Sequence, residues 1–214
     1  MKVHIRIVKI GLFGASLATL AIAQSSSTPK SAQAPSPPSI QNPVDALSRT
    51  GENHKLLATL VGTWSFTGKH SDPNSPYPEF KGTVVRHGIW EGRYFITETT
   101  GGKIAMPWAD GREVAYQDMM MDGYDNEKKK FVRAMIDNHY DAGILLLEGT
   151  YDPSTKSFTY LGEAPGSPPG KKNTIHMLVT ILDQDHYREE FSVKGDDGWE
   201  SGVTVDNYTR LKQN

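Results

Sequence analysis

The stretch "TLVGTWSF", Thr59 to Phe66, lies where the character of the sequence changes. Up to its second residue, Leu60, the chain has leucines at the spacing of a helix, Leu56, Leu57 and Leu60. After Gly62 the chain consists of short segments that alternate or run β-branched and aromatic, with turn residues between them, which is typical of β-strands. Gly-Thr-Trp therefore marks the passage from a helix into the first strand, where glycine permits a sharp turn.

Ten segments after this motif have the composition of strands, and no helical period of useful length separates them. Consecutive short strands joined by tight turns predict an antiparallel meander rather than a parallel sheet with crossover helices. The predicted strands are Thr63–Lys69, Phe80–Trp90, Arg93–Thr100, Val114–Tyr124, Lys130–His139, Ile144–Tyr151, Ser157–Glu163, Thr174–Leu182, His186–Val193 and Trp199–Arg210.

A Tyr-Asp motif occurs twice, in "YDNEKKKF" (residues 124–131) and in "YDPSTKSF" (residues 151–158). An aspartate at the start of a tight turn caps that turn through its own side chain, and the Asn or Pro that follows suits the next position. We interpret both copies as hairpin turns, so that Tyr124 and Asp125 are structural residues. The alternative, a pair of acidic loop sites, is the weaker interpretation.

A long meander has two exposed edges, and pairing of the first strand with the last removes both. The sequence therefore predicts an all-β fold, a closed antiparallel barrel of about ten strands with a short N-terminal helix across one end. Trp64 would plug that end of the barrel. Arg210, at the end of the last strand, would lie across its indole ring in a cation–π contact. Gly62, Trp64 and Arg210 are thus predicted to be structural.

Gly-x-Trp on the first strand, with an Arg or Lys from the last strand stacked on it, resembles the calycin superfamily of lipocalins, fatty-acid-binding proteins and their relatives. More closely, residues from Asn53 to Arg210 resemble the bacterial family known as domain of unknown function 1579. That resemblance implies a lipocalin-like barrel and an exported protein, and it implies no activity. It rests on His54, Leu57, Leu60, Gly62-Thr63-Trp64, Gly123-Tyr124-Asp125, Asp137, Gly149, Gly162-Glu163 and Tyr208-Thr209-Arg210.

The first 23 residues have the layout of a secretory signal peptide, with a basic start, a short apolar run and a small-x-small end. The apolar run, Ile10 to Ala23, is shorter than the about 20 residues that span a bilayer comfortably. We therefore expect export to the periplasm or secretion, and no stable membrane insertion after cleavage. The alternative is a retained N-terminal anchor.

Residues 24–43 are rich in Ser, Pro, Gln and Ala, a composition that predicts a disordered linker. Residues 44–213 remain as the folded domain. Without residues 1–23 the chain has 20 basic against 25 acidic residues, a formal charge of −5, which argues against a nucleic acid or an anionic membrane as partner. Because the chain has no cysteine, disulfides and thiolate metal sites are excluded.

A barrel of this size can hold one small ligand in its lumen, and we expect a small, mostly apolar molecule there by analogy with the fold. Trp108 and the Met119-Met120-Met121 run are candidates for an adaptable lining. Strand alternation lets at most two of the three methionines point inward, and we assign Met119 and Met121. The alternative is that these side chains simply fill the core.

Two histidines lie within apolar strands, His87 in "TVVRHGIW" and His176 in "TIHMLVTIL". Either could ligate haem iron from inside the barrel, as in the calycin-like nitrobindins. The alternative is a strand histidine that faces solvent or is satisfied by a backbone carbonyl. Haem is therefore the only cofactor that the sequence suggests, and the preferred interpretation has none.

Asp137, His139 and Asp141 alternate and would share a face if the strand reached that far. Two carboxylates and an imidazole suit a metal cation, but the same residues also form a polar hairpin loop. We prefer the loop, expect no metal site, and keep Asp137 and His139 as candidate ligand-binding residues.

The sequence carries no motif for a serine elbow, a phosphate loop, a dinucleotide site or a zinc helix. Glu189 and Glu190 are adjacent on a strand and point to opposite faces, so they cannot act as a catalytic pair. We assign no catalytic residue and leave enzymatic activity open. A third possibility is a structural or interaction module with a filled lumen. An empty lumen of about 300 Å³ or more would favour a ligand instead.

Overall fold

The computed structural model describes residues 43–72, 79–106, 109–139, 143–166, 170–195 and 200–212. The chain divides into two units, Met1–Ile40 and Gln41–Asn214, and every described residue belongs to the second. The predicted signal peptide lies outside the described residues, as does the predicted linker apart from Pro43.

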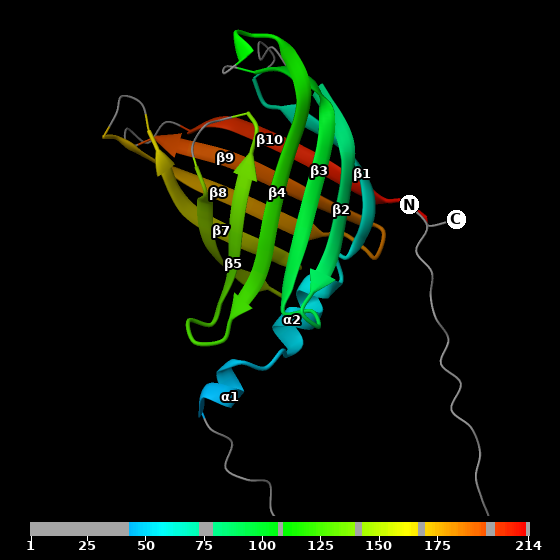
Figure 1. Ribbon diagram of the computed structural model, residues 1–214, viewed down its shortest axis with the longest axis vertical. Coiled ribbons are helices and arrows are strands. Elements are labelled where there is room, and N and C mark those ends of the chain that lie inside the picture. Colours follow the sequence, from blue (N-terminus) through cyan, green and yellow to red (C-terminus); the bar gives the residue numbers. More distant parts are fainter. Residues whose placement is uncertain are drawn as a thin grey trace, which may run out of the picture. The chain divides into compact units, whose positions relative to one another are not determined.

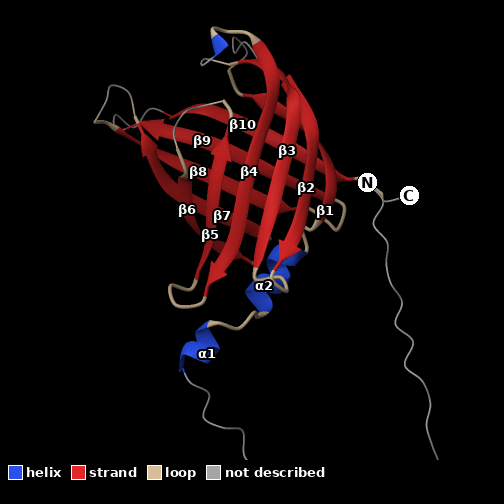
Figure 2. Cartoon of the chain, viewed as in Figure 1, coloured by secondary structure: helices blue, strands red, loops and turns tan. Residues whose placement is uncertain are grey.

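The described chain folds into a closed antiparallel barrel of ten strands (Figures 1 and 2), which confirms the predicted fold class. Neighbouring strands in the barrel are also neighbours in sequence, and β1 pairs with β10 to close it. The largest difference from the predicted bounds is in β3, which runs on past Thr100. The strands are β1 Gly62–His70, β2 Glu79–Ile89, β3 Tyr94–Ala105, β4 Glu113–Asp125, β5 Lys130–Asp137, β6 Leu145–Asp152, β7 Ser157–Pro165, β8 Lys172–Ile181, β9 His186–Gly195 and β10 Glu200–Arg210.

Two short helices precede the barrel, α1 (Pro43–Leu47) and α2 (Glu52–Ala58). Figure 1 shows α2 lying at one end of the barrel, and it packs there against β3 and β4. It buries Leu57 and His54. In the parts of the chain that the structure describes, neither helix has the length and apolar character needed to cross a membrane.

Both Tyr-Asp motifs form hairpin turns, as the sequence predicts. The Asp125 carboxylate accepts hydrogen bonds from the backbone N–H groups of Glu127 and Lys128, both at 2.9 Å. Asp152 accepts one from the N–H of Ser154 at 2.8 Å in the second turn. These side chains satisfy backbone donors that the turn leaves without a partner, which explains the repeated aspartate.

Trp64 closes the floor of the barrel. Its side chain is 1% exposed, and its indole N–H donates to the carbonyl of Leu60 at 3.0 Å. The guanidinium carbon of Arg210 lies 4.0 Å from the centre of the indole ring, and the two residues are paired in the register of β1 and β10. The predicted cation–π contact between the first and last strands is therefore confirmed.

Arg210 also ties the link between helix and barrel to the last strand. Its guanidinium donates to the carbonyls of Val61 at 2.5 Å, Thr59 at 3.0 Å and Gln184 at 2.9 Å. Gly62 makes this arrangement possible, because its φ of 142° suits only glycine and a Cβ there would lie 2.4 Å from a nitrogen of Arg210. Glycine is thus required at position 62 for two reasons, the backbone conformation there and the close approach of Arg210.

Aromatic rings fill the lower lumen above this floor. Trp64 meets Tyr187 edge to face, with ring centroids 4.7 Å apart, and Tyr187 stacks on Tyr208 at 4.1 Å. On the other side Phe131 and Phe158 meet edge to face at 4.9 Å. Such pairs add about 0.5–1.5 kcal/mol each beyond their burial, so this layer is the core of the domain.

We predict that Trp64→Ala lowers the free energy of unfolding by about 3–5 kcal/mol, because it empties the floor and removes the platform under Arg210. Trp90 is the matched control, since its side chain is 71% exposed. Trp90→Ala should change the free energy of unfolding by about 1 kcal/mol or less. Urea unfolding measures both changes, and equal losses in the two variants would contradict the plug.

Candidate functional site

Above the aromatic layer, charged and polar side chains point into the lumen from most of the barrel wall. Strand alternation places them there beside buried apolar neighbours such as Val84, Met120 and Val179. Register brings several of them together, because Arg86 faces Thr97, Asp122 faces Arg133 and Asp206 faces Glu189 on neighbouring strands. We call this group the lumenal polar cluster, comprising Arg86, Thr97, Thr99, Asp118, Asp122, Arg133, Glu189 and Asp206.

Asp122 is the centre of the cluster and is fully buried. Arg133 donates to it twice, from Nε at 2.7 Å and from Nη2 at 3.2 Å, and Arg86 donates to it from Nη1. Burial by itself would raise the pKa of Asp122, but the two guanidinium groups hold that pKa below its usual value. Asp122 is therefore an ionised carboxylate held between two arginines.

The two arginines extend the network across the lumen. Arg133 reaches across the lumen to β9, where its Nη1 lies 3.3 Å from Oε2 of Glu189. Arg86 donates to the hydroxyl of Thr97 at 3.1 Å. Each guanidinium also lies over an aromatic ring, Arg133 at 4.8 Å from the ring centre of Tyr160. These contacts fix the arginine side chains in place.

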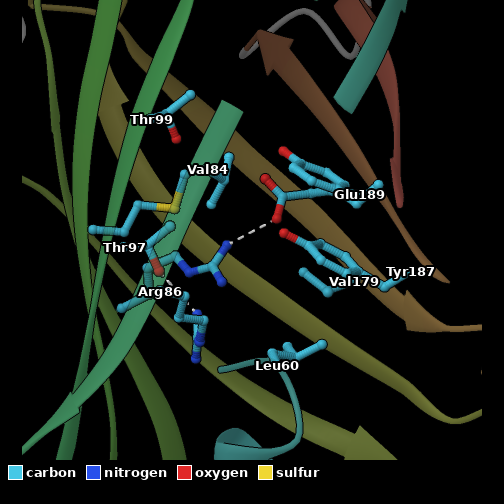
Figure 3. A pocket seen from close by; sticks show the side chains of 11 residues that line it. Leu60, Val84, Arg86, Thr97, Thr99, Val179, Tyr187 and Glu189 are labelled. Atoms are coloured by element: carbon cyan, nitrogen blue, oxygen red, sulfur yellow. Dashed lines mark hydrogen bonds and ion pairs between the residues drawn. The ribbon is translucent and has the colours of Figure 1, made fainter. Parts of the chain in front are cut away.

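Several buried polar atoms of the cluster have no hydrogen-bond partner among the described residues. They are Nε and Nη2 of Arg86, Oδ1 of Asp118 and Oδ1 of Asp206. Arg86 is 4% exposed, and it lines a cavity between the walls, with Leu60 at its base (Figure 3). A buried donor or acceptor left unsatisfied costs about 1–3 kcal/mol, so these atoms call for a partner from solution.

The cavity itself is small. Its volume is about 10 Å³, which is enough for about one water molecule. Its lining is mixed rather than mostly apolar, since Arg86, Arg133, Glu189 and two threonines contribute to it. The volume of this cavity is far below the about 300 Å³ that would favour a ligand in an empty lumen.

The carboxyl groups of Asp118, Glu189 and Asp206 lie near one another in the upper lumen. The pKa values of Asp118 and Asp206 are raised. Burial raises the pKa of Asp118 to about 6, although hydrogen bonds from Thr99 and Tyr116 oppose the change. Burial, together with the charges of Glu189 and Asp118, raises the pKa of Asp206 to about 8. At pH 7 the cluster therefore offers an ionised Asp118 and a mostly protonated Asp206.

The methionine assignment is wrong by one residue. Met119 and Met121 face outward, with 44% and 40% of their surface exposed, while Met120 is the one that lines the lumen. The phase of β4 is set by Asp122, which points inward to its two arginines. Three consecutive methionines do not indicate which alternate residues of β4 face inward. The buried position of Asp122 shows it. Trp108 lies outside the described residues.

His87 and His176 also lie on the outer face of the barrel. Their neighbours Arg86 and Met177 point into the lumen, so alternation turns both histidines away from it. His87 is exposed and His176 is partly buried. Neither can be a lumenal ligand of haem iron, and the haem interpretation of these two residues is wrong.

Asp137 and His139 lie where the predicted loop begins. Asp137 ends β5 and pairs with Asp118, so it shares the inner face of the barrel. Its carboxylate accepts the backbone N–H of His139 at 2.7 Å, a contact typical of a turn. Burial lowers the pKa of His139 despite the nearby Asp137. Among the described residues, no group of three or more His, Asp or Glu side chains could hold a metal ion.

A second hollow, of about 480 Å³, lies on the outer surface over β1, β2, β3 and β10. Serine, threonine and glycine residues form most of its lining, and Lys81 is the charged residue among them. None of the residues with buried, unsatisfied atoms named above lines this hollow. The lumenal polar cluster is therefore the better candidate site.

The sequence of the barrel also assigns it to a family. Residues 49–210 match the family described as "Protein of unknown function (DUF1579)". The chain belongs to this family. The resemblance drawn from the Gly-Thr-Trp and Tyr-Asp motifs is thereby confirmed. A comparison of this DUF1579 protein with curated proteins found no match.

The solved structures that are similar to the DUF1579 barrel include the following two. One is an S-type phycobiliprotein lyase, CPES, from Guillardia theta, with a TM-score of 0.47 and 8% identity over 81% of this chain and 100% of that chain. The other is a protein of unknown function from the DUF3598 family of Nostoc punctiforme PCC 73102, with a TM-score of 0.24 and 8% identity over 76% of this chain and 100% of that chain. At these values neither structure tells what the DUF1579 protein binds.

The sequence analysis missed Arg86, Asp122 and Arg133, which form the centre of the site. A signal was present, because each of these charged residues lies two positions from an apolar residue that belongs to the core or lumen. A charged residue at a position predicted to face inward has two explanations. Either the inner and outer faces of the strand were assigned the wrong way round, or the charge belongs to a buried ion pair. Finding two arginines and one aspartate in such positions would have favoured the ion pair.

We predict that Asp122→Asn lowers the free energy of unfolding by about 3–5 kcal/mol, since it leaves two buried guanidinium groups without their shared counter-charge. Glu163→Gln is the matched control, because Glu163 forms an ion pair with Lys172 in which both side chains are about two-thirds exposed, at 65% and 66%. That change should alter the free energy of unfolding by about 1 kcal/mol or less. Urea unfolding of both variants measures the difference, and similar losses would show that Asp122 is not a structural charge.

We predict that Asp206→Asn stabilises the domain more at pH 8.5 than at pH 5. The pKa of Asp206, about 8 in the folded chain, lies above its ordinary value of 3.8, so the folded state binds the proton more tightly than the unfolded state. The contribution of Asp206 to the free energy of unfolding therefore falls, by a few kcal/mol at most, as the pH rises from about 4 to about 8.5. Asparagine removes this contribution. Thermal melts of both proteins across that range test it, and a difference that does not change with pH would contradict it.

Proposed function

We propose that this protein binds a small polar molecule inside the barrel, at the edge of Arg86 that has no acceptor within the described chain. The carrying observation is that Nε and Nη2 of Arg86 are buried beside a cavity and unsatisfied. Barrels that bind a single small molecule use this location. A fixed guanidinium with free donors is suited to a carboxylate or another oxygen acceptor.

Asp118 on β4 and Asp206 on β10 also point into the lumen, and we assign them to the other end of the ligand. Neither lines the small cavity beside Arg86, so a ligand that reaches them extends beyond that cavity. Asp118 provides an acceptor oxygen without a donor among the described residues, and the protonated Asp206 can donate. A complementary molecule accepts hydrogen bonds at one end and donates them at the other. We therefore propose a small carboxylic acid that also carries an amino or hydroxyl group, in place of the mostly apolar ligand expected from the fold.

Binding requires side chains in the lumen to move, because the cavity holds only about one water. Met120 is the natural one to move, since it lines the cavity and has a flexible, unbranched side chain. Arg86 and Arg133 stay fixed by Asp122. The floor offers no entry, since Trp64 and Leu60 are buried there.

The test is a thermal-shift screen of small amino and hydroxy carboxylic acids, with fatty acids and retinoids as the contrasting apolar set, followed by calorimetric titration. We expect saturable binding of a polar compound that weakens at least tenfold in Asp118→Asn and Thr97→Val. Both changes preserve side-chain shape, and Thr97→Val removes the hydroxyl that orients Arg86. Thr150→Val, on the outer face of β6, should bind normally. Binding of the apolar set alone, or no binding at all, would overturn the proposal.

A module that acts through its surface is the second candidate, and the small volume of the lumenal cavity, about 10 Å³, favours it. We further propose that the protein works outside the cytoplasm, a proposal supported by the signal-peptide pattern of residues 1–23. Fractionation of the host with N-terminal sequencing of the mature chain tests this. Intact residues 1–23 in a cytoplasmic fraction would contradict it.

A further inference from the structure

The three carboxyl groups of the upper lumen come from three strands, Asp118 from β4, Glu189 from β9 and Asp206 from β10. Register pairs Asp206 with Glu189, and the charges of Glu189 and Asp118 both act on Asp206. Glu189 has a cationic partner, because its Oε2 lies 3.3 Å from Nη1 of Arg133. Oδ1 of Asp118 and Oδ1 of Asp206 are buried and have no hydrogen-bond partner among the described residues.

This acidic group adjoins the cavity beside Arg86. Glu189 lines that cavity, and so does Thr99, whose side chain forms a hydrogen bond with Asp118. Arg86 lines it as well, is 4% exposed, and keeps Nε and Nη2 without a partner in the described chain. A molecule in the lumen therefore meets buried donors at Arg86 and buried acceptors at Asp118 and Asp206.

The surroundings of Asp206 contain no fixed cation. On β1 the paired residue is Gly68, where a Cβ would clash with Oδ1 of Asp206, and the next residue on the same face, His70, accepts a backbone N–H through its Nδ1. Tyr208 on the same strand and Tyr116 on β4 are the phenols whose pKa values respond to the charge of Asp206. The positive charge that these carboxyl groups lack can come from a ligand.

We infer that the acidic end of the lumen binds a protonated amine, so that the ligand is an amino acid rather than a hydroxy acid. This inference rests on the proposed function, which leaves the two classes open. An ammonium group has three donors, so it can bond with Asp118, with Asp206 and with one further acceptor. Because the described carboxyl groups form no set that could hold a metal ion, we assign the cation to the ligand itself.

Binding of an ammonium group releases a proton. The pKa of Asp206 is about 8 in the free protein, so its carboxyl group is mostly protonated at pH 7. A positive charge beside that carboxyl lowers its pKa, and the proton passes to solvent while the ligand stays an ammonium ion bound to a carboxylate. A hydroxyl group carries no charge, so a hydroxy acid leaves the proton on Asp206.

The test compares amino and hydroxy acids of equal length by calorimetric titration of the full chain at pH 7. The pairs are glycine and glycolic acid, 4-aminobutyric and 4-hydroxybutyric acid, and 6-aminohexanoic and 6-hydroxyhexanoic acid. We expect the amino acid of the best-binding pair to bind at least tenfold more tightly than its hydroxy counterpart. Titration in two buffers with different ionisation enthalpies should show the release of about 0.5–1 proton for each molecule bound.

Asp206→Asn gives the second measurement. Asparagine can donate a hydrogen bond, as the protonated carboxyl does, but it cannot become an anion. We therefore expect this variant to lose at least tenfold in affinity for the amino acid, to release no proton, and to bind the hydroxy acid nearly as before. Glu190→Gln is the matched control, because Glu190 follows Glu189 on β9 and points to the outer face. It should keep both the preference and the proton release.

Each outcome has one meaning. Equal affinity for the two members of every pair, or binding of the amino acid without proton release, overturns the inference and leaves the proposed function standing. A preference for the amino acid that persists in Asp206→Asn also overturns the inference. Failure of every acid to bind overturns the inference together with the proposed function.

Discussion

The contact between Arg210 and Trp64 is the interaction on which the rest of the barrel depends. It joins the last residue of β10 to the third residue of β1, and the same guanidinium binds the carbonyls that link α2 to the barrel. One side chain thus ties three parts of the chain at the floor. The aromatic layer packs on this floor, and Leu60, Tyr187 and Tyr208 also line the small cavity beside Arg86.

The lumen combines two kinds of interior in one barrel. Its lower half is an ordinary aromatic core, whereas its upper half holds two arginines and several carboxyl groups around the fully buried carboxylate of Asp122. Buried ion networks seldom add stability over an apolar packing of similar shape. Their presence here, with atoms of Arg86 left unsatisfied in the described chain, supports the proposal that a polar molecule binds in the lumen.

The fold was predictable from the sequence because its signals are local. Glycine at position 62, tryptophan at 64 and arginine at 210 predicted the floor, and the Tyr-Asp turns predicted the meander. The site was not predictable in the same way. Alternation gives the two faces of a strand but not which face is inner, and three successive methionines left the phase of β4 undetermined. Asp122 points inward only because arginines from β2 and β5 meet it there, a fact about distant strands that no single segment carries.

The pairing of β1 with β10 has a consequence for how the chain folds. The two strands that complete the barrel are the first and the last in the sequence, with Trp64 opposite Arg210. A ring closed between such distant positions is a slow, non-local event. Until β10 has been synthesised, β1 has no neighbour on one side, and Trp64 has no cation over its ring. The growing chain therefore carries an open sheet edge through most of its synthesis, and its final residues complete the assembly.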